Sequence, residues 1–437
     1  MKMMIEIMNN KLQLFNVVLF ILTTIVATKL MIKWAPKTLF RSSKRPPPVV
    51  KGRLPLIRGV VRFLSNPVEM LNEEYQTLGS VFTMNAVYKN ITFLLEPDVS
   101  AHFFKAGETE LSQREVYQFT VPIFGPGVVY DAVYSVRQEQ FHFFEDALRI
   151  DNLRGYADAM LEEVQDYFSK WEEKGEVDLK QEMENIIILM ASRCFLGKDI
   201  RDSLSKDIIA LIKEINVAMV PLTTLFPYLP IPPHNRRDKA RKKLDEVFSN
   251  IIASRQSSHK TKDDMLQCLI DSKYKDGRAT SVGEVTGLLV TALYGGQHTG
   301  AATSIWTGVF LLHYKQHWFT AKAEQKELMK KHGNKVNYDV LLEMQLLYRC
   351  IKESLRLHPP NAFLLRQSHT DFTMTSRRDG TKYDIPKGHI IAASPFFSNR
   401  LPHIYKKPND YDPDRFTPEK ERGSISRAVL FLVVWRR

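Results

Sequence analysis

The feature of the sequence that most restricts the fold is a run of 30 residues, Val285 to Tyr314, without Asp, Glu, Lys, Arg or Pro. As an α-helix this run is about 45 Å long, because each residue adds about 1.5 Å. A transmembrane helix is one interpretation, but polar residues such as Gln297 and Thr299 lie in its middle. We therefore expect a buried central helix with a break at Gly295 and Gly296, where a flat group can lie against the backbone.

The remaining pattern predicts a mainly helical body with a smaller β part. With 44% hydrophobic and 25% charged residues, the chain has the balance of an ordinary packed protein. Apolar residues at spacings of three and four predict helices over 138–150, 154–172, 181–195, 202–219 and 236–256. Short β-like runs cover Val81–Thr83, Ile91–Leu95 after a turn at Lys89-Asn90, Phe363–Arg366, Phe372–Thr375 and His389–Ala393.

The amino end predicts a membrane anchor. Leu12–Thr28 has no charged residue, and if Lys29 snorkels the apolar stretch reaches Ile32, about 20 residues, which is enough to cross a bilayer. Several basic residues follow the stretch, so the positive-inside rule puts the body in the cytosol. A cleaved signal peptide is the alternative, but the run is long and its basic residues are on the wrong side. Pro46-Pro47-Pro48 then provides a stiff spacer after the anchor.

The chain is basic, with 61 Lys and Arg against 49 Asp and Glu and a net charge of +12. This surplus suits nucleic acid, an anionic membrane or an acidic partner protein and does not choose among them. A local basic cluster follows the proline-rich connector Phe226–Pro233. It consists of Arg236, Arg237, Lys239, Arg241, Lys242 and Lys243. We interpret this cluster as a solvated helix start or as a surface that dips into the bilayer.

Three motifs in the second half of the chain are informative through their order and spacing. Glu353 and Arg356 are three residues apart, so on a helix they share one face and can pair. They follow the G-G-Q-H-T sequence by about 55 residues and precede Asp412–Phe416 by about 60. This ordered set resembles the cytochrome P450 family of haem-thiolate monooxygenases. In that family the Glu–Arg pair locks to the arginine of the later motif, here Arg415, and braces the haem-binding core.

Other motifs narrow the resemblance to the sterol 14α-demethylases, and most closely to the plant enzymes that act on obtusifoliol. They are G-G-Q-H-T, Y-Q-F with F-G-P-G-V-V-Y, and F-P-Y-L-P-I-P, at residues 295–299, 117–119, 124–130 and 226–232. The resemblance implies three successive oxidations at the 14α-methyl group with molecular oxygen. It also implies haem as cofactor, a sterol substrate, NADPH–cytochrome reductase and membrane lipid as partners, no nucleic acid, and a single-pass location in the endoplasmic reticulum membrane.

The resemblance also assigns site residues by position. Tyr117, Tyr130 and Arg366, with Arg137 as an addition, match the groups that hold the haem propionates. Gly296, His298 and Thr299 match the groove where oxygen is bound and protonated, with His298 where most of the family carry an acid. Phe119, Phe124, Ala292 and Leu365 match positions that line the sterol cavity. Apolar walls exclude water from a nearly all-carbon ligand.

The family's cysteine loop, F-x-x-G-x-x-x-C-x-G, does not follow Phe416 in this sequence. The three cysteines, Cys194, Cys268 and Cys350, do not fit that motif and are too few for a disulfide framework or zinc cluster, which suits a reducing compartment. We therefore expect a catalytic domain over 46–420 that is incomplete at its carboxyl end, a divergent tail over 421–437 and no metal ligand. The alternative to an enzyme is a non-catalytic sterol- or haem-binding remnant or an unstable truncated product.

Overall fold

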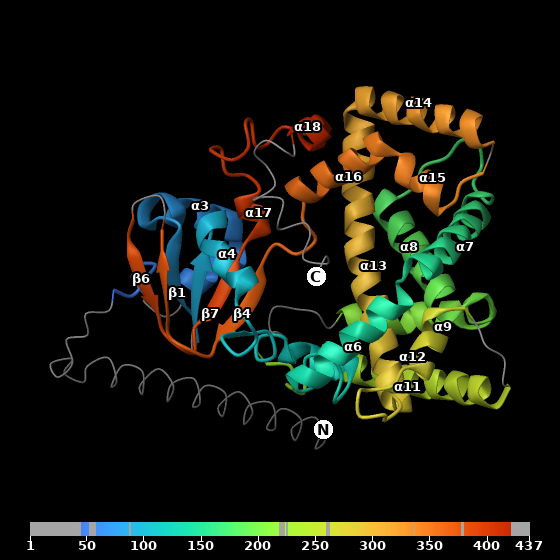
Figure 1. Ribbon diagram of the computed structural model, residues 1–437, viewed down its shortest axis with the longest axis horizontal. Coiled ribbons are helices and arrows are strands. Elements are labelled where there is room, and N and C mark those ends of the chain that lie inside the picture. Colours follow the sequence, from blue (N-terminus) through green and yellow to red (C-terminus); the bar gives the residue numbers. More distant parts are fainter. Residues whose placement is uncertain are drawn as a thin grey trace, which may run out of the picture. The chain divides into compact units, whose positions relative to one another are not determined.

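The computed structural model describes residues 45–51, 58–86, 89–217, 223, 226–258, 263–333, 335–376 and 380–420 (Figure 1). The predicted anchor helix and the tail over 421–437 lie outside these residues. Within the described part, no helix is long and apolar enough to cross a bilayer. The chain forms two compact units, one comprising the residues up to Thr92 with Asp371–His389, and the other Phe93–Thr370 with the residues from Ile390 onward.

The smaller unit contains two helices and short antiparallel strands. Its elements are α2 (Arg58–Ser65), α3 (Pro67–Leu78), β1 (Val81–Ala86), the start of β2 (Lys89–Leu94), β5 (Phe372–Thr375) and β6 (Lys382–Ile385). In β5 and β6, Phe372 lies opposite Ile385. The predicted strand over Phe372–Thr375 is confirmed. The predicted turn at Lys89-Asn90 is wrong, because both residues belong to β2.

The larger unit is mainly helical, as expected. Its longer helices are α4 (Pro97–Lys105), α6 (Tyr134–Ala147), α7 (Ile150–Phe168), α8 (Leu179–Leu196), α9 (Lys198–Val217), α11 (Pro232–Ser258), α12 (Met265–Asp271), α13 (Val282–His313), α14 (Lys315–His332), α15 (Tyr338–Glu343) and α16 (Gln345–Leu357). Short turns are η1 (Gln118–Thr120), α5 (Val121–Phe124), α17 (Pro395–Ser398), η2 (Pro413–Phe416) and α18 (Pro418–Lys420). The prediction of mainly α structure with a smaller β part is confirmed.

Three strands complete the larger unit: β3 (Leu111–Ser112), β4 (Leu364–Ser368) and β7 (Ile390–Ala393). β4 pairs antiparallel with β3 on one side and β7 on the other, so that Leu365 lies opposite Ala392 and Ser112 opposite Gln367. This pairing brings the loop before β3 next to β4, although the two are far apart in sequence.

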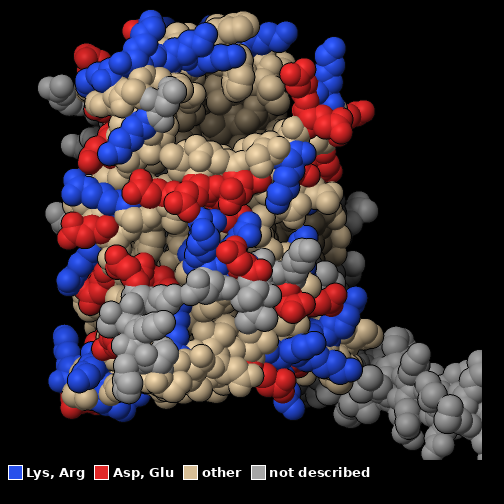
Figure 2. Space-filling view, turned by 90° about the vertical axis from the view of Figure 1, so that its right-hand side faces the viewer, with Lys and Arg blue, Asp and Glu red and all other residues tan. Residues whose placement is uncertain are grey.

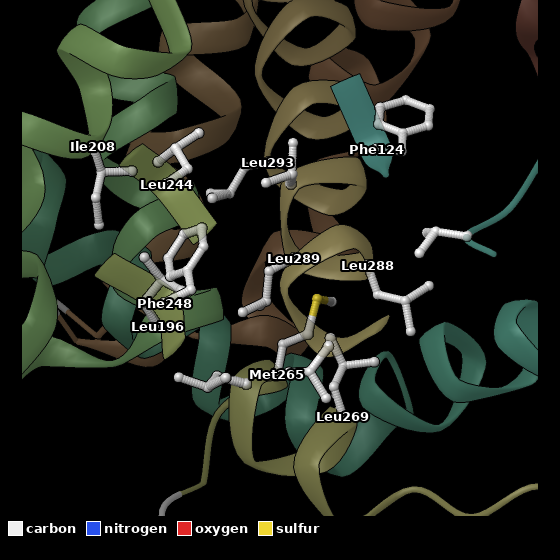
Figure 3. Packing of buried hydrophobic residues seen from close by; sticks show 14 of the residues in the cluster. Phe124, Leu196, Ile208, Leu244, Phe248, Met265, Leu269, Leu288, Leu289 and Leu293 are labelled. Atoms are coloured by element: carbon white, nitrogen blue, oxygen red, sulfur yellow. The ribbon is translucent and has the colours of Figure 1, made fainter. Parts of the chain in front are cut away.

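The uncharged run forms α13, which begins with a capping box between Ser281 and Glu284 and continues to His313. Figure 1 shows it as the long helix beside α8 and α16. The expected break at the glycine pair is wrong, because the helix is continuous there. Its first half is buried in a hydrophobic core with α8, α9, α11 and α12, and Figure 3 shows Leu288, Leu289 and Leu293 pointing into that core.

The basic cluster after the connector divides into two groups. α11 begins at Pro232, inside the stretch we expected to be an irregular connector, since proline is tolerated in a first helical turn. Arg236, Lys239, Lys242 and Lys243 are exposed, whereas Arg237 and Arg241 are buried. The prediction of a uniformly solvated or bilayer-dipping start is therefore wrong for these two arginines. On the face shown in Figure 2, basic and acidic side chains are interspersed, so the positive surplus is not gathered there into one patch.

Candidate functional site

Two tyrosines form the centre of the candidate site in the larger unit. The rings of Tyr117 and Tyr130 stack with their centroids 4.7 Å apart and their planes 23° apart. The Tyr117 hydroxyl accepts a hydrogen bond from the backbone N–H of Leu365 in β4 (3.4 Å). Burial raises the pKa of both phenols, so both are neutral at pH 7 and keep a proton to donate.

Two guanidinium groups lie within electrostatic reach of these phenols. Arg137, on α6 and only 2% exposed, places Nη2 2.5 Å from the carboxylate of Glu108 and its guanidinium carbon 5.8 Å from the centre of the Tyr130 ring. Arg366, on β4, donates from Nη1 to the carbonyl of Ala106 (2.8 Å). Burial lowers the pKa of Arg366, an effect that Glu108 opposes, and the side chain remains protonated.

Each of these arginines has one buried nitrogen that could donate a further hydrogen bond. Among the described residues, Arg137 Nη1 and Arg366 Nε have no hydrogen-bond partner. A buried donor without an acceptor is costly, and the cost is larger when the group is charged. These two donors, together with the two phenols, therefore suit a ligand that brings carboxylate oxygens.

Glu108 belongs to the site and was missed by the sequence analysis. Its carboxylate accepts from the Ser112 hydroxyl (2.7 Å) and the backbone N–H of Gln113 (3.2 Å) and also pairs with Arg137. It precedes β3 in a loop, 29 positions before its arginine, and no motif marks it. Only the fold reveals which of the 49 acidic residues meets Arg137.

The middle of α13 carries the predicted oxygen-groove residues. His298 is exposed, and the Thr299 hydroxyl donates to the carbonyl of Gly295, one turn earlier (2.8 Å). A Cβ added to Gly295 would meet nothing within 4 Å, whereas one added to Gly296 would touch the Phe195 ring at 3.6 Å. The open space that we expected along the glycine pair is therefore beside Gly295, whereas Gly296 lies next to the Phe195 ring of α8 at a distance that a methyl group would also tolerate.

The four predicted sterol-cavity residues fall into two pairs. Phe119 has its ring 6.0 Å from that of Tyr117, and Leu365 bonds the same tyrosine through its backbone. Phe124 and Ala292 instead pack at the α13 core. Figure 3 shows Phe124 beside α13, where its ring lies 5.9 Å from that of Tyr294. Segment 117–130 thus joins the tyrosine pair to the central helix.

The Glu353, Arg356 and Arg415 side chains meet in one buried network. Arg356 binds both oxygens of Glu353 (2.7 and 2.8 Å), and Arg415 donates to the same carboxylate (3.3 Å). Arg356 also donates to three backbone carbonyls, those of Asn399, Pro408 and Asp410. The network therefore ties α16 to the loops before η2.

The three cysteines, Cys194, Cys268 and Cys350, lie on α8, α12 and α16. Cys194 on α8 contacts the carbonyl of Tyr156, and Cys350 on α16 is fully buried near Tyr411. Burial raises the pKa of all three thiols, that of Cys194 to about 12. Burial therefore favours the protonated thiol at all three positions.

Comparison with known proteins agrees with this geometry. A family model described as "Cytochrome P450" matches residues 46–430. The chain is 57% identical to the "Sterol 14-demethylase" of Arabidopsis thaliana, over 95% of this chain and 84% of that protein. It is 55% identical to the "Obtusifoliol 14-alpha demethylase" of Sorghum bicolor over 94% and 83%, and 35% identical to the "Lanosterol 14-alpha demethylase" of Bos taurus over 85% and 73%.

The fold has a counterpart among solved structures. The retinoic-acid-bound cyanobacterial CYP120A1 superposes with a TM-score of 0.74 at 21% identity, covering 87% of this chain and 84% of that one. At this level of identity the likeness concerns the fold alone. The sequence family, the helical fold and the braced Glu–Arg–Arg network together lead to one assignment. The chain belongs to the cytochrome P450 family.

Proposed function

We propose that this protein is a sterol 14α-demethylase, a monooxygenase that removes the 14α-methyl group of obtusifoliol-type sterols. It uses molecular oxygen and electrons from NADPH–cytochrome reductase. The observation that carries the proposal is the 55–57% identity to two plant demethylases over nearly the whole chain. The site supports it, because two phenols and two partly unsatisfied guanidinium groups fit a ligand with two carboxylates.

Cytochrome P450 proteins use haem, whose two propionates provide such carboxylates. We propose that the propionates are held by Tyr117, Tyr130, Arg137 and Arg366. The ion pair with Glu108 fixes the position of the Arg137 guanidinium. When bound, haem supplies the activation of oxygen that this chemistry requires. Phenols and guanidinium groups form charge-assisted hydrogen bonds to carboxylates, which are stronger than bonds between neutral groups.

The remaining predicted residues act on the sterol and on protons. Phe119, Phe124, Ala292 and Leu365 orient the sterol and keep water away from it. The exposed imidazole of His298 exchanges protons with solvent. The Thr299 hydroxyl, bonded to the Gly295 carbonyl, would relay a proton when that bond opens, accepting one from solvent as it donates its own.

A second candidate function is non-catalytic binding of sterol or haem. It is supported by the sequence after Phe416, which does not contain the F-x-x-G-x-x-x-C-x-G motif, and by the three cysteines, none of which fits that motif. The two candidates differ in one requirement only, a cysteine loop that follows η2. A test of the proposed activity therefore joins residues 1–420 to the corresponding carboxyl-terminal segment of the Arabidopsis relative.

With this extended chain and added reductase, we expect faster demethylation of obtusifoliol than of lanosterol. The Phe119 ring, held beside Tyr117, fills space that a second 4-methyl group of the sterol needs. Phe119→Leu is expected to lower the preference for obtusifoliol by about 5- to 150-fold, because one pocket group contributes about 1–3 kcal/mol. The ratio of kcat/KM for the two sterols measures this.

Phe143→Leu serves as the matched control, because Phe143 packs against Tyr274 in the core and not in the proposed cavity. It should lower stability without changing the ratio. Equal kcat/KM for both sterols before any substitution contradicts the proposed specificity, and an inactive extended chain that binds haem normally contradicts the proposed function. The 437-residue chain should show no thiolate-type absorbance band in its reduced carbon monoxide complex.

We further propose a single-pass location in the endoplasmic reticulum membrane, with residues 1–45 as anchor, 46–420 as catalytic domain facing the cytosol and 421–437 as a separate tail. The proposal is supported by the apolar run before Lys29 and the basic residues after it. Membrane association should survive alkaline carbonate washing and be lost when residues 1–45 are deleted. Recovery of the full chain in the soluble fraction speaks against the anchor.

A further inference from the structure

Arg241 connects α11 to the short helix α5. Its Nε donates to the carbonyl of Ile123 (2.5 Å) and its Nη2 to the carbonyl of Phe124 (3.0 Å). Nη1 pairs with Asp245, one turn further along α11. The residue is 7% exposed, so these bonds are protected from water. Arg241 belongs to the basic cluster at the start of α11, yet its side chain points into the protein and binds two consecutive backbone carbonyls.

α5 is so short that its last carbonyl groups need a hydrogen-bond donor from outside the helix. It has four residues and ends at Gly125, whose φ of 100° prevents the helix from continuing. The last carbonyls of a helix have no partner within the helix and require one from elsewhere. The planar guanidinium offers parallel donors that serve two neighbouring carbonyls at once. The fit is close, since a Cβ on Gly125 would lie 2.9 Å from Arg241 Nη2.

The chain around Phe124, which Arg241 contacts from α11, also packs closely against α13. A Cβ on Gly287 would lie 2.6 Å from Val128 Cγ2 and even closer to the carbonyl oxygen of Phe124. Glycine at this position therefore allows the backbone of the segment to approach the helix. Figure 3 shows Phe124 on this side of α13, and its ring contacts Tyr294 there. The Phe124 peptide is thus held between Arg241 and Gly287.

We propose that Arg241 is a positioning residue that fixes segment 118–124, and with it Phe119 and Phe124, for sterol binding. Among the described residues, no backbone N–H of the segment donates to the two final carbonyls of α5, so loss of the Arg241 guanidinium frees that end of the helix. The sterol part of this inference rests on the proposed function, whereas the bracing of the segment does not. The two parts are therefore measured separately.

The bracing is tested by hydrogen–deuterium exchange with mass spectrometry on the full chain. In Arg241→Met, peptides covering 118–131 should exchange about tenfold faster or more, because charge-assisted hydrogen bonds at the end of α5 are lost. The Gly125 amide, bonded to the carbonyl of Val121, reports directly on α5. Arg241→Lys should give an intermediate rate, since an ammonium is a point donor without the planar fork.

Arg237→Met is the matched control. Arg237 lies one turn earlier on α11, is 1% exposed and donates to the carbonyl of Pro227 (2.9 Å), which is outside the segment. Its replacement should leave exchange in 118–131 unchanged. Gly287→Ala provides an independent variant, because its methyl group displaces the Phe124 carbonyl from the α13 side, and the same peptides should exchange faster. Native rates in 118–131 for a folded Arg241→Met chain, or for Gly287→Ala if Arg241→Met does not fold, overturn the proposal.

Sterol positioning is tested with radiolabelled obtusifoliol delivered from cyclodextrin to the same chains. Binding to Arg241→Met should be about tenfold weaker and binding to Arg237→Met unchanged. In the extended, active chain, Arg241→Met should raise KM with little change in kcat, as expected for a group that orients the substrate without touching reacting atoms. If Arg241→Met speeds hydrogen–deuterium exchange in 118–131 but leaves the affinity for obtusifoliol unchanged, the proposed role of Arg241 in sterol binding is refuted. If the extended chain binds haem normally but does not bind obtusifoliol, the proposed function fails and the exchange result alone decides the bracing.

Discussion

Replacing Arg356 with alanine is expected to destabilise the larger unit by about 3–5 kcal/mol, the usual cost of removing one partner of a buried ion pair. Arg356 and Glu353 are both 0% exposed. Without Arg356, the Glu353 carboxylate stays buried with Arg415 as its remaining ionic partner, and three backbone carbonyls lose a donor. Because whole domains are stable by only about 5–15 kcal/mol, the denaturant midpoint should fall steeply.

Arg349→Ala is the control for this prediction. Arg349 lies on the same helix, α16, and pairs with Asp414 at the surface, where Asp414 is 57% exposed. Exposed pairs contribute about 0–1 kcal/mol, so this replacement should barely move the midpoint followed by circular dichroism. A loss below about 1.5 kcal/mol for Arg356→Ala would show that the network does not brace the fold.

The long central helix could be predicted from the sequence, and its continuity could not. Thirty uncharged residues restrict a helix to a buried or membrane position, and the polar residues in the middle favoured the buried position. The predicted break assumed that two glycines interrupt a helix. A glycine in a helix costs only about 1 kcal/mol, which the packing of residues such as Leu288 and Leu293 outweighs.

The two buried arginines of α11 show why a run of charges misleads. Six basic residues within eight positions suggested a solvated face. Positions 237 and 241 nevertheless share the four-residue spacing of the buried residues Leu244, Phe248 and Ile252. This spacing was readable in the sequence, because side chains four apart lie on one helix face. The identity of the carbonyls that Arg241 contacts could not be read from the sequence, because they lie more than 100 residues earlier in the chain.

The site residues were assigned through family resemblance, and physical reasoning from the sequence alone would not have found them. Tyr117, Tyr130, Arg137 and Arg366 come from different elements, and no spacing in the sequence connects them. The structure brings their side chains into one cluster and adds Glu108, whose role depends on the loop before β3. Long-range antiparallel pairing of β3 with β4 creates this neighbourhood, and such pairing has no local signal.

Haem should bind the chain about 100-fold or more weakly when Arg137 and Arg366 are both replaced by methionine. Each arginine offers a buried, unpartnered nitrogen, and a hydrogen bond to a charged group contributes about 1.5–3 kcal/mol. Two such bonds therefore correspond to a factor of about 10² to 10⁴ in the dissociation constant, measured by titrating haem into the chain and following its absorbance. The propionate contacts themselves involve no cysteine, so the effect of the two substitutions can be compared in the 437-residue chain and in the extended chain.

The single variants separate haem binding from folding. Arg137→Met leaves Glu108 partly buried without its cation and should also lower stability. Arg366 donates to the carbonyl of Ala106 and forms no ion pair within the described part of the chain, so Arg366→Met should lower stability less. Arg114→Met, which removes an exposed arginine bonded to the carbonyl of Asp131, should alter neither property. If Arg366→Met retains full haem affinity while Arg137→Met loses it only in proportion to unfolding, the free nitrogens do not bind propionates. In that case the tyrosine pair alone carries the contact, and Tyr130→Phe becomes the variant that should weaken haem binding.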